Sequence, residues 1–380
     1  MAISANVISV AMYALGRIAD VIAIAEYRLD RYDWCAQAKP TKRGGKTMPA
    51  NGFKNLSERI RSFPTPVAGL ALGIASLGLS WENLLPGVGL AETGAMIAAF
   101  LLILLSVRFV LHPKTLSRDL ANPVVGGVVA TYAMAWMLVS ISLWQSSHLA
   151  GALLWLFGLC MHVVFLALFA RNRMAVRFEL PHMVPSWFIP PVGVIVAAVS
   201  YRGPHEGPLF LLAVTALYFG MVIYALMLPV MFYRFIFAEN VAVTAMPTLA
   251  VLAAPASLSL TGYLSLVDDP QPLPVILLMG ISVLMTAIVY VAFVRLLALP
   301  FSPGFSAYTF PLVIGATALF KTADQLEVWQ IRQKLIDQTH GLAVFELLIA
   351  TAVVVYVIAR FGQFAWTHWW QVPRPDLLEA

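Results

Sequence analysis

Charged residues are scarce in this sequence: Asp, Glu, Lys and Arg make up 11% of it, against 60% hydrophobic residues. A soluble globular domain carries about 25% charged residues, so a soluble chain with so few charges could not cover its surface with polar groups. The mean hydropathy of +0.83 therefore indicates that lipid surrounds much of the chain. Long apolar runs without ten-residue alternation favour transmembrane helices over barrel strands.

Cysteine is almost absent, and no catalytic group of residues is found. Cys35 lies in a polar stretch and Cys160 in an apolar run, so neither a disulfide framework nor a cysteine metal site is expected. The histidines of the loops are isolated and lack metal-ligand spacing, and no phosphate-binding loop is found. We therefore expect no enzyme, no metal and no cofactor.

Ten apolar runs are long enough, or nearly so, to cross the roughly 30 Å of hydrocarbon in a bilayer. They predict an all-α integral membrane fold with ten transmembrane helices in a domain over residues 63–361. The runs cover residues 63–81, 91–111, 123–143, 149–170, 185–201, 207–233, 246–267, 273–299, 306–322 and 342–361.

The charges between these runs predict the orientation in the membrane. The positive-inside rule places the basic loops, and with them both termini, in the cytoplasm of a cell-membrane protein. This explains the net charge of +5 without nucleic acid as a partner. One side holds the stretch before residue 62 and Arg108, Lys114, Arg118, Arg171, Arg173, Arg177 and Arg234, and the other holds Glu82, Glu92, Asp268 and Asp269 with Arg202.

The two ends of the chain differ from the apolar domain. Residues 1–62 are predicted to be a cytoplasmic N-terminal extension, and residues 362–380 a short cytoplasmic tail. Residues 1–26 are apolar but lack the basic start of a signal peptide. Two interpretations stay open for them: an interfacial amphipathic helix, or an extension that precedes a functional start at Met48.

Proline recurs in the odd-numbered runs and is missing from the second, fourth and tenth. A proline inside a helix removes a hydrogen bond, and lipid tolerates the freed groups only where protein or a water-filled cavity satisfies them. The alternation predicts five helical hairpins in a quasi-fivefold arrangement, with the kinked helices lining a central pore. The alternative is that proline and glycine are simply common in membrane helices. The predicted kinks lie at Pro66, Pro123, Pro190, Pro255 and Pro311.

Three charged or titratable side chains within the runs have two interpretations each. Lys321 ends the ninth run and either attracts anions at the outer mouth or is a solvated helix end. His162 is expected to bond to a neighbouring helix rather than to carry protons. Glu346 lies near one end of the last run, where it would reach water and have a structural role. A pore with no ring of acids and a basic cytoplasmic rim suits anions.

Several motifs, in order, resemble the tellurite-resistance/dicarboxylate transporter family, which includes bacterial TehA, fungal malate permeases and plant guard-cell slow anion channels. The resemblance covers about residues 62–362. It implies a ten-helix bundle with a pore through each protomer, a homotrimer in the lipid bilayer, and a phenylalanine gate at the position of Phe310. The motifs are Phe63-Pro64-Thr65-Pro66, Asn122-Pro123-Val124, Pro185-Ser186-Trp187-Phe188-Ile189-Pro190, Leu252-Ala253-Ala254-Pro255-Ala256 and Ala307-Tyr308-Thr309-Phe310-Pro311.

The favoured function is a slow-type anion channel that passes small anions. The first alternative is a proton-coupled transporter of C4-dicarboxylates or of an oxyanion such as tellurite, and the second is a membrane enzyme or a non-transporting scaffold. The chain also departs from the family, since its N-terminal stretch is longer than that of TehA. Its tail is short, so activation by phosphorylation of long tails is not carried over from the plant channels.

Overall fold

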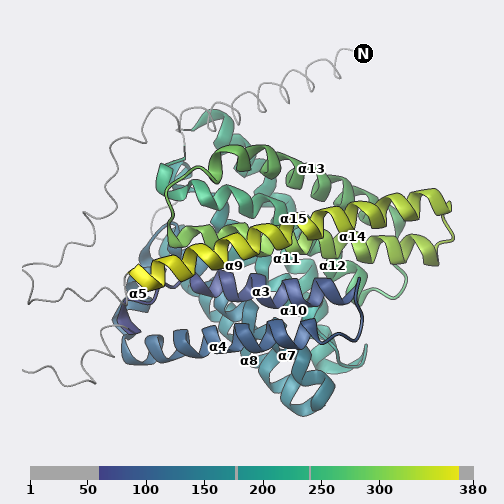
Figure 1. Ribbon diagram of the computed structural model, residues 1–380, viewed down its shortest axis with the longest axis horizontal. Coiled ribbons are helices and arrows are strands. Elements are labelled where there is room, and N and C mark those ends of the chain that lie inside the picture. Colours follow the sequence, from purple (N-terminus) through teal and green to yellow (C-terminus); the bar gives the residue numbers. More distant parts are fainter. Residues whose placement is uncertain (1–59, 176–178, 239–240, 368–380) are drawn as a thin grey trace, which may run out of the picture.

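The computed structural model describes residues 60–175, 179–238 and 241–367, and these residues are predominantly helical (Figure 1). Most of the predicted N-terminal extension, with Cys35 and Met48, lies outside the described residues, and so does most of the predicted tail. Within these described residues, eight helices are long and apolar enough to cross a membrane, so the chain is a multi-pass membrane protein. They are Leu90–Leu111, Val125–Ser146, His148–Arg173, Gly207–Phe237, Val243–Leu266, Pro272–Leu296, Pro303–Val328 and Gln333–Ala365.

The first and fifth apolar runs form shorter apolar helices, Val67–Glu82 and Pro185–Ser200. The 16 residues of Val67–Glu82 extend about 24 Å at a rise of 1.5 Å per residue, less than the roughly 30 Å of a hydrocarbon core. The count of ten spans therefore stays a prediction.

The five proline-bearing runs form five segments, here called the inner segments, and three of them combine 3₁₀-helix with α-helix. They are α3 (Val67–Glu82); α6 (Val125–Val128) with α7 (Ala130–Ser146); η6 (Pro185–Phe188), α9 (Ile189–Val192), η7 (Gly193–Ile195) and α10 (Val196–Ser200); η8 (Val243–Ala253) with α12 (Ala254–Leu266); and η9 (Pro303–Tyr308) with α14 (Phe310–Val328).

The other runs form long uninterrupted α-helices, here called the outer helices. They are α4 (Leu90–Leu111), α8 (His148–Ala170), α11 (Gly207–Phe237), α13 (Pro272–Leu296) and α15 (Gln333–Ala365). A short helix, α5 (Pro113–Ala121), connects α4 to the second inner segment. Figure 1 shows α14 and α15 lying side by side, as expected for a hairpin.

Burial separates the two groups. Between 78% and 89% of the most apolar stretch is buried in the inner segments that are long enough to span, but only 28% to 39% in the outer helices. Most of α3 and almost all of residues 185–200 are also buried. An outer helix that exposes most of its apolar surface is stable only against lipid, so the proline-bearing segments form the interior of the protein.

Packing contacts connect the inner segments in a closed order. α3 packs against α7, α7 against α10, α10 against α12, α12 against α14, and α14 again against α3. Each inner segment also packs against the outer helix that follows it in the chain. This pairing is that of five hairpins, while the quasi-fivefold symmetry itself stays a prediction.

The five prolines predicted to kink helices lie where α-helices begin rather than in helix interiors. Pro66 is the N-cap of α3, and Pro123 lies two residues before α6. The first turns of α9, α12 and α14 contain Pro190, Pro255 and Pro311. A 3₁₀-helix directly precedes α9 and α12, and one residue separates a 3₁₀-helix from α14. A first-turn residue needs no intrahelical N–H bond, so proline fits there without the clash that a kinked interior would require.

Candidate functional site

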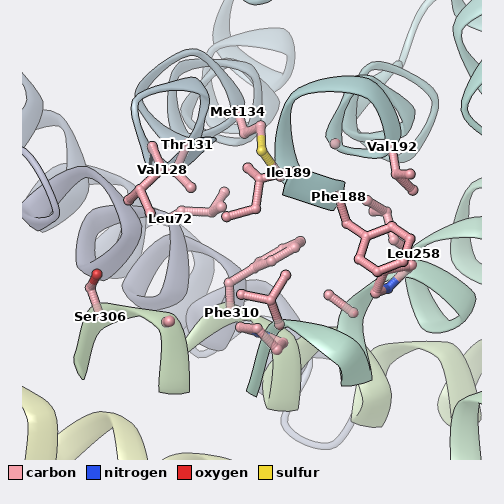
Figure 2. Close-up of a pocket in the computed structure, with 16 residues that line it drawn as sticks. Leu72, Val128, Thr131, Met134, Phe188, Ile189, Val192, Leu258, Ser306 and Phe310 are labelled. Atoms are coloured by element: carbon pink, nitrogen blue, oxygen red, sulfur yellow. Dashed lines mark hydrogen bonds between the residues drawn. The ribbon is translucent and has the colours of Figure 1, made fainter. Parts of the chain in front are cut away.

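A small cavity lies between the inner segments (Figure 2). Its volume of about 50 Å³ exceeds the roughly 10–15 Å³ that one water molecule needs, so it has room for a few water molecules or a small ion. All five inner segments contribute to its wall. The lining residues are Leu72, Val128, Thr131, Met134, Phe188, Ile189, Val192, Gly193, Val251, Ala254, Pro255, Leu258, Ser306, Ala307, Phe310 and Pro311.

The wall of the cavity is almost wholly apolar. Thr131 and Ser306 are the two hydroxyl-bearing residues of the lining, and no charged residue belongs to it. The Thr131 hydroxyl donates to the Val128 carbonyl over 2.7 Å, so it is already engaged. An ion that enters this space loses hydration and gains few polar partners, which makes the cavity a barrier to ions.

Phe310 is the largest side chain that α14 contributes to the cavity wall. It is the first residue of α14 and is 5% exposed. Figure 2 shows its ring extending into the cavity, toward Ile189 and Phe188 on the opposite wall.

The backbone that carries Phe310 is fixed to α3. The hydroxyl of Thr309 donates to the Gly69 carbonyl over 3.1 Å and to the Ser306 carbonyl over 2.7 Å. A Cβ on Gly73 would collide with the Thr309 side chain and approach the Phe310 nitrogen to 3.2 Å, so α3 and the start of α14 approach closely because residue 73 is glycine. The Phe310 ring, in contrast, has no polar atom, so only packing holds it in place.

A second aromatic residue, Phe188, lines the cavity from η6. Its ring packs edge-on against Tyr224 of α11, with 6.0 Å between ring centroids. The sequence reasoning missed this residue, although it lies in one of the motifs that carried the family resemblance. The available signal was an aromatic residue directly before the Ile189-Pro190 step, a place analogous to that of Phe310 before Pro311.

The structure brings only some of the predicted kink residues to the cavity. Pro255 and Pro311 line it, whereas Pro66, Pro123 and Pro190 do not belong to the lining. The last two have structural bonds instead.

Backbone carbonyls near these prolines are satisfied by side chains. The Pro190 carbonyl pairs with His162 Nε2 over 2.7 Å, and the Pro123 carbonyl accepts from Trp187 Nε1 over 3.1 Å. The Val124 carbonyl accepts from the Ser186 hydroxyl over 3.1 Å. The predicted bond of His162 to a neighbouring segment is confirmed, and the carbonyls meet the requirement that backbone at membrane depth has a partner.

Lys321 lies near one end of the inner segments, but α14 continues for seven residues beyond it to Val328, so Lys321 does not end the helix as predicted. α3 and α14 run parallel, since Gly73 meets the start of α14 while Trp81 packs near Phe320. Lys321 therefore lies at the end opposite to the start of α3. It is partly exposed and interacts electrostatically with Arg202, which follows α10, and with Asp324. Two cations thus occur near this end, as the interpretation of Lys321 as an attractor of anions requires.

The other end of the domain carries a basic cavity of about 340 Å³. Its wall comes from the chain before α3 and from the α4–α5 connection. The lining residues are Arg61, Leu111, His112, Pro113, Lys114, Thr115 and Arg118. Both ends of the inner segments are therefore near basic side chains, while the lining of the central cavity has no charge.

Known proteins share this sequence pattern. Residues 62–364 match the family described as SLAC1, voltage-dependent anion channel. Uncharacterized transporter MJ0762 of Methanocaldococcus jannaschii is 27% identical over 232 residues, which is 56% of this chain and 68% of that protein. Uncharacterized transporter MJ0576 of the same organism is 24% identical over 246 residues, which is 59% of this chain and 71% of that protein. The family match covers most of the chain and agrees with the motifs and the helical architecture, and the protein therefore belongs to the SLAC1 family of voltage-dependent anion channels.

Proposed function

We propose that this protein is a channel of the slow-anion type, which passes small anions along a path between its inner segments and is gated by Phe310. The observation that supports this most is the position of the Phe310 ring, in a cavity that all five inner segments line. The path lies within one protomer. The family resemblance adds the proposal of a homotrimer in the cell membrane, with both termini in the cytoplasm.

Charge favours anions over cations along this path. Arg61, Lys114 and Arg118 lie at one end, and Lys321 and Arg202 at the other. Basic groups at the mouths of a low-dielectric path raise the local anion concentration and repel cations. The lining residues include no carboxylate that would attract cations.

The gate acts through hydration. An anion beside the Phe310 ring meets carbon atoms where it had water, and this desolvation is the barrier to conduction. Rotation of the ring away from the cavity widens the space for water. Replacing Phe310 by alanine is therefore expected to raise anion conductance.

A proton-coupled transporter of C4-dicarboxylates or of an oxyanion such as tellurite is the second candidate. One observation favours it: the carboxyl group of Glu346 is buried inside the transmembrane domain, and such groups commonly carry protons in transporters. A channel and a coupled transporter differ in what sets the reversal potential of the current.

The deciding experiment uses purified protein in planar bilayers and proteoliposomes, with gradients of chloride, nitrate or malate. A channel gives currents that reverse at the potential set by the anion gradient, whether or not a pH gradient is present. A proton-coupled transporter gives a reversal potential that moves with the pH gradient, and a pH gradient alone drives uptake. Folded protein that conducts none of these anions would refute the proposed function.

A further inference from the structure

Glu346 lies much deeper in the protein than its sequence position suggested. The last apolar run begins at residue 342, but α15 begins at Gln333, so Glu346 lies about 20 Å along the helix at 1.5 Å per residue. The residue is 3% exposed. The expectation that it reaches water is wrong in this structure, because α13 and α14 pack around its carboxyl group.

Three helices meet at the carboxyl group of Glu346. A Cβ placed on Gly315 of α14 would lie 2.7 Å from Glu346 Oε2 and 3.5 Å from Thr286 Oγ1 of α13. Tyr290, one turn further along α13, interacts electrostatically with Glu346. The absence of a side chain at residue 315 therefore leaves a small space that contains the carboxyl and the threonine hydroxyl.

The polar atoms around this space lack partners. Glu346 Oε2, Thr286 Oγ1 and Tyr290 OH are all buried, and none has a hydrogen-bond partner within the part of the chain that the structure describes. Native proteins rarely leave buried polar atoms unpaired, and each exception needs an explanation. Here three such atoms lie on neighbouring helices within one region of the transmembrane domain.

No charge compensates a Glu346 carboxylate. Tyr290 is the titratable group that α13 brings near it. On α14 the charged residues Lys321, Asp324 and Glu327 lie nearer the helix end and interact among themselves, and His340 of α15 acts on Asp324. The acid of the adjacent α3, Glu82, bonds to the backbone of residues 87–91. Among the described residues, no charged group acts on Glu346.

An ionised carboxylate without a counter-charge is strongly disfavoured in such a place. A protonated carboxyl is neutral, and its O–H is suited to donate to a nearby hydroxyl such as that of Thr286. The neutral acid therefore fits the packing of α13, α14 and α15 seen here. Ionisation requires water or a cation to enter between these helices, which requires that the helices move.

We propose that Glu346 is a proton-binding site: its carboxyl holds a proton in this packing of α13, α14 and α15, and releases it when the packing opens to water. Gly315 lies five residues after Phe310 on α14. A change in how α14 packs at Gly315 therefore acts on the same helix that carries the Phe310 ring, so binding of a proton is linked to the state of the pore. Only the link to the pore rests on the proposed function.

Infrared spectroscopy of the protein in lipid vesicles tests the proton site without any transport. At neutral pH the wild-type protein is expected to show the carbonyl band of a protonated carboxylic acid, and the Glu346→Gln variant to lack it. Thr286→Val is expected to shift this band, since it removes a hydroxyl beside the same space. Glu327→Gln, which alters an exposed acid of α14, is the matched control and should leave the band unchanged. Wild-type and Glu346→Gln spectra without this difference would overturn the proposal.

Conductance measured at equal pH on both sides of the membrane tests the link to the pore. The wild-type and Glu327→Gln proteins are expected to change anion conductance with pH, and Glu346→Gln to keep its low-pH conductance at every pH. Tyr290→Phe retains the carboxyl and should only move the midpoint, which keeps the test decisive if Glu346→Gln does not fold. Equal pH dependence in all variants would overturn the link. A protein that conducts no anion refutes the proposed function but leaves the infrared result valid.

Discussion

Removing the Arg108 guanidinium is expected to destabilise the start of the first hairpin. Arg108, in the last turn of α4, is 6% exposed. It donates to the hydroxyl of Thr65 and, over 3.2 Å, to Asp119 Oδ2 of α5. It also donates to the Arg61 carbonyl over 3.3 Å, and the Thr65 hydroxyl donates to Asp119 Oδ2 over 2.5 Å. One guanidinium thus joins the chain before α3, the end of α4 and α5.

The size of the effect follows from the burial of the pair. Breaking a fully buried ion pair by removing one partner costs about 3–5 kcal/mol. The Asp119 side chain is 24% exposed and keeps its bond from Thr65, so part of its charge stays solvated. We expect Arg108→Gln to reduce the unfolding free energy by about 2–4 kcal/mol, within the range for loss of buried hydrogen bonds to charged groups.

A double-mutant cycle isolates the interaction. Arg108→Gln, Asp119→Asn and the double variant are compared by SDS-titrated unfolding in detergent micelles, with a coupling of about 1–3 kcal/mol expected for groups in contact. Arg118→Gln, an exposed arginine of the same short helix, is the control and should change stability by less than about 0.5 kcal/mol. A loss of stability for Arg108→Gln no larger than that of the control, or a coupling energy near zero, would show that Arg108 and Asp119 do not stabilise this region together.

Three further substitutions test other parts of the site. Lys321→Gln should lower anion conductance at low ionic strength and have little effect at high salt, because salt screens the mouth potential; the exposed Lys334→Gln is the comparison in bilayer recordings. Gly73→Ala forces the Thr309 side chain to move, so we expect a loss of about 1–3 kcal/mol in unfolding free energy and an altered basal conductance in the same recordings. His162→Leu leaves a buried carbonyl unpaired and should cost about 1–3 kcal/mol, while the pH profile of anion flux stays as in the wild-type protein.

The proline pattern predicted which segments are interior, because a proline removes a backbone hydrogen bond within its own segment. A proline-bearing segment is disfavoured against lipid, and the structure buries the segments that contain Pro255 and Pro311 while exposing α4 and α8. The pattern did not predict that these prolines begin α-helices. That depends on the 3₁₀ turns of η8 and η9 before them, whose apolar sequences do not distinguish a 3₁₀-helix from an α-helix.

The site was predicted in part. The resemblance singled out Phe310, and the structure places its ring in the central cavity, while its role as a gate stays a proposal. Phe188 was missed because aromatic residues are common in apolar runs, and its one signal, a place directly before the Ile189-Pro190 step, is weak on its own. The burial of Glu346 was missed because hydropathy marks the apolar run but does not show which side chains the neighbouring helices cover. The contact of Glu346 with the region of Gly315 and Thr286 depends on how α13, α14 and α15 pack, and a local stretch of sequence does not reveal that packing.

A cysteine placed on the cavity wall reports whether anions pass between the inner segments. Thr131 of α7 lines the cavity. Ser140, nine residues later in the same helix, is also buried but lies on the opposite side of the helix. Each is replaced by cysteine in a protein that has serine at both native cysteines and alanine at Phe310.

Anion current through these proteins is then recorded while a negatively charged methanethiosulfonate reagent is applied. An anion path lined by Thr131 predicts a large current in both proteins. The reagent should block it in the Thr131→Cys protein and leave it unchanged in the Ser140→Cys protein. No gain of current on Phe310→Ala, or a current that the reagent leaves unchanged with Thr131→Cys, would contradict it.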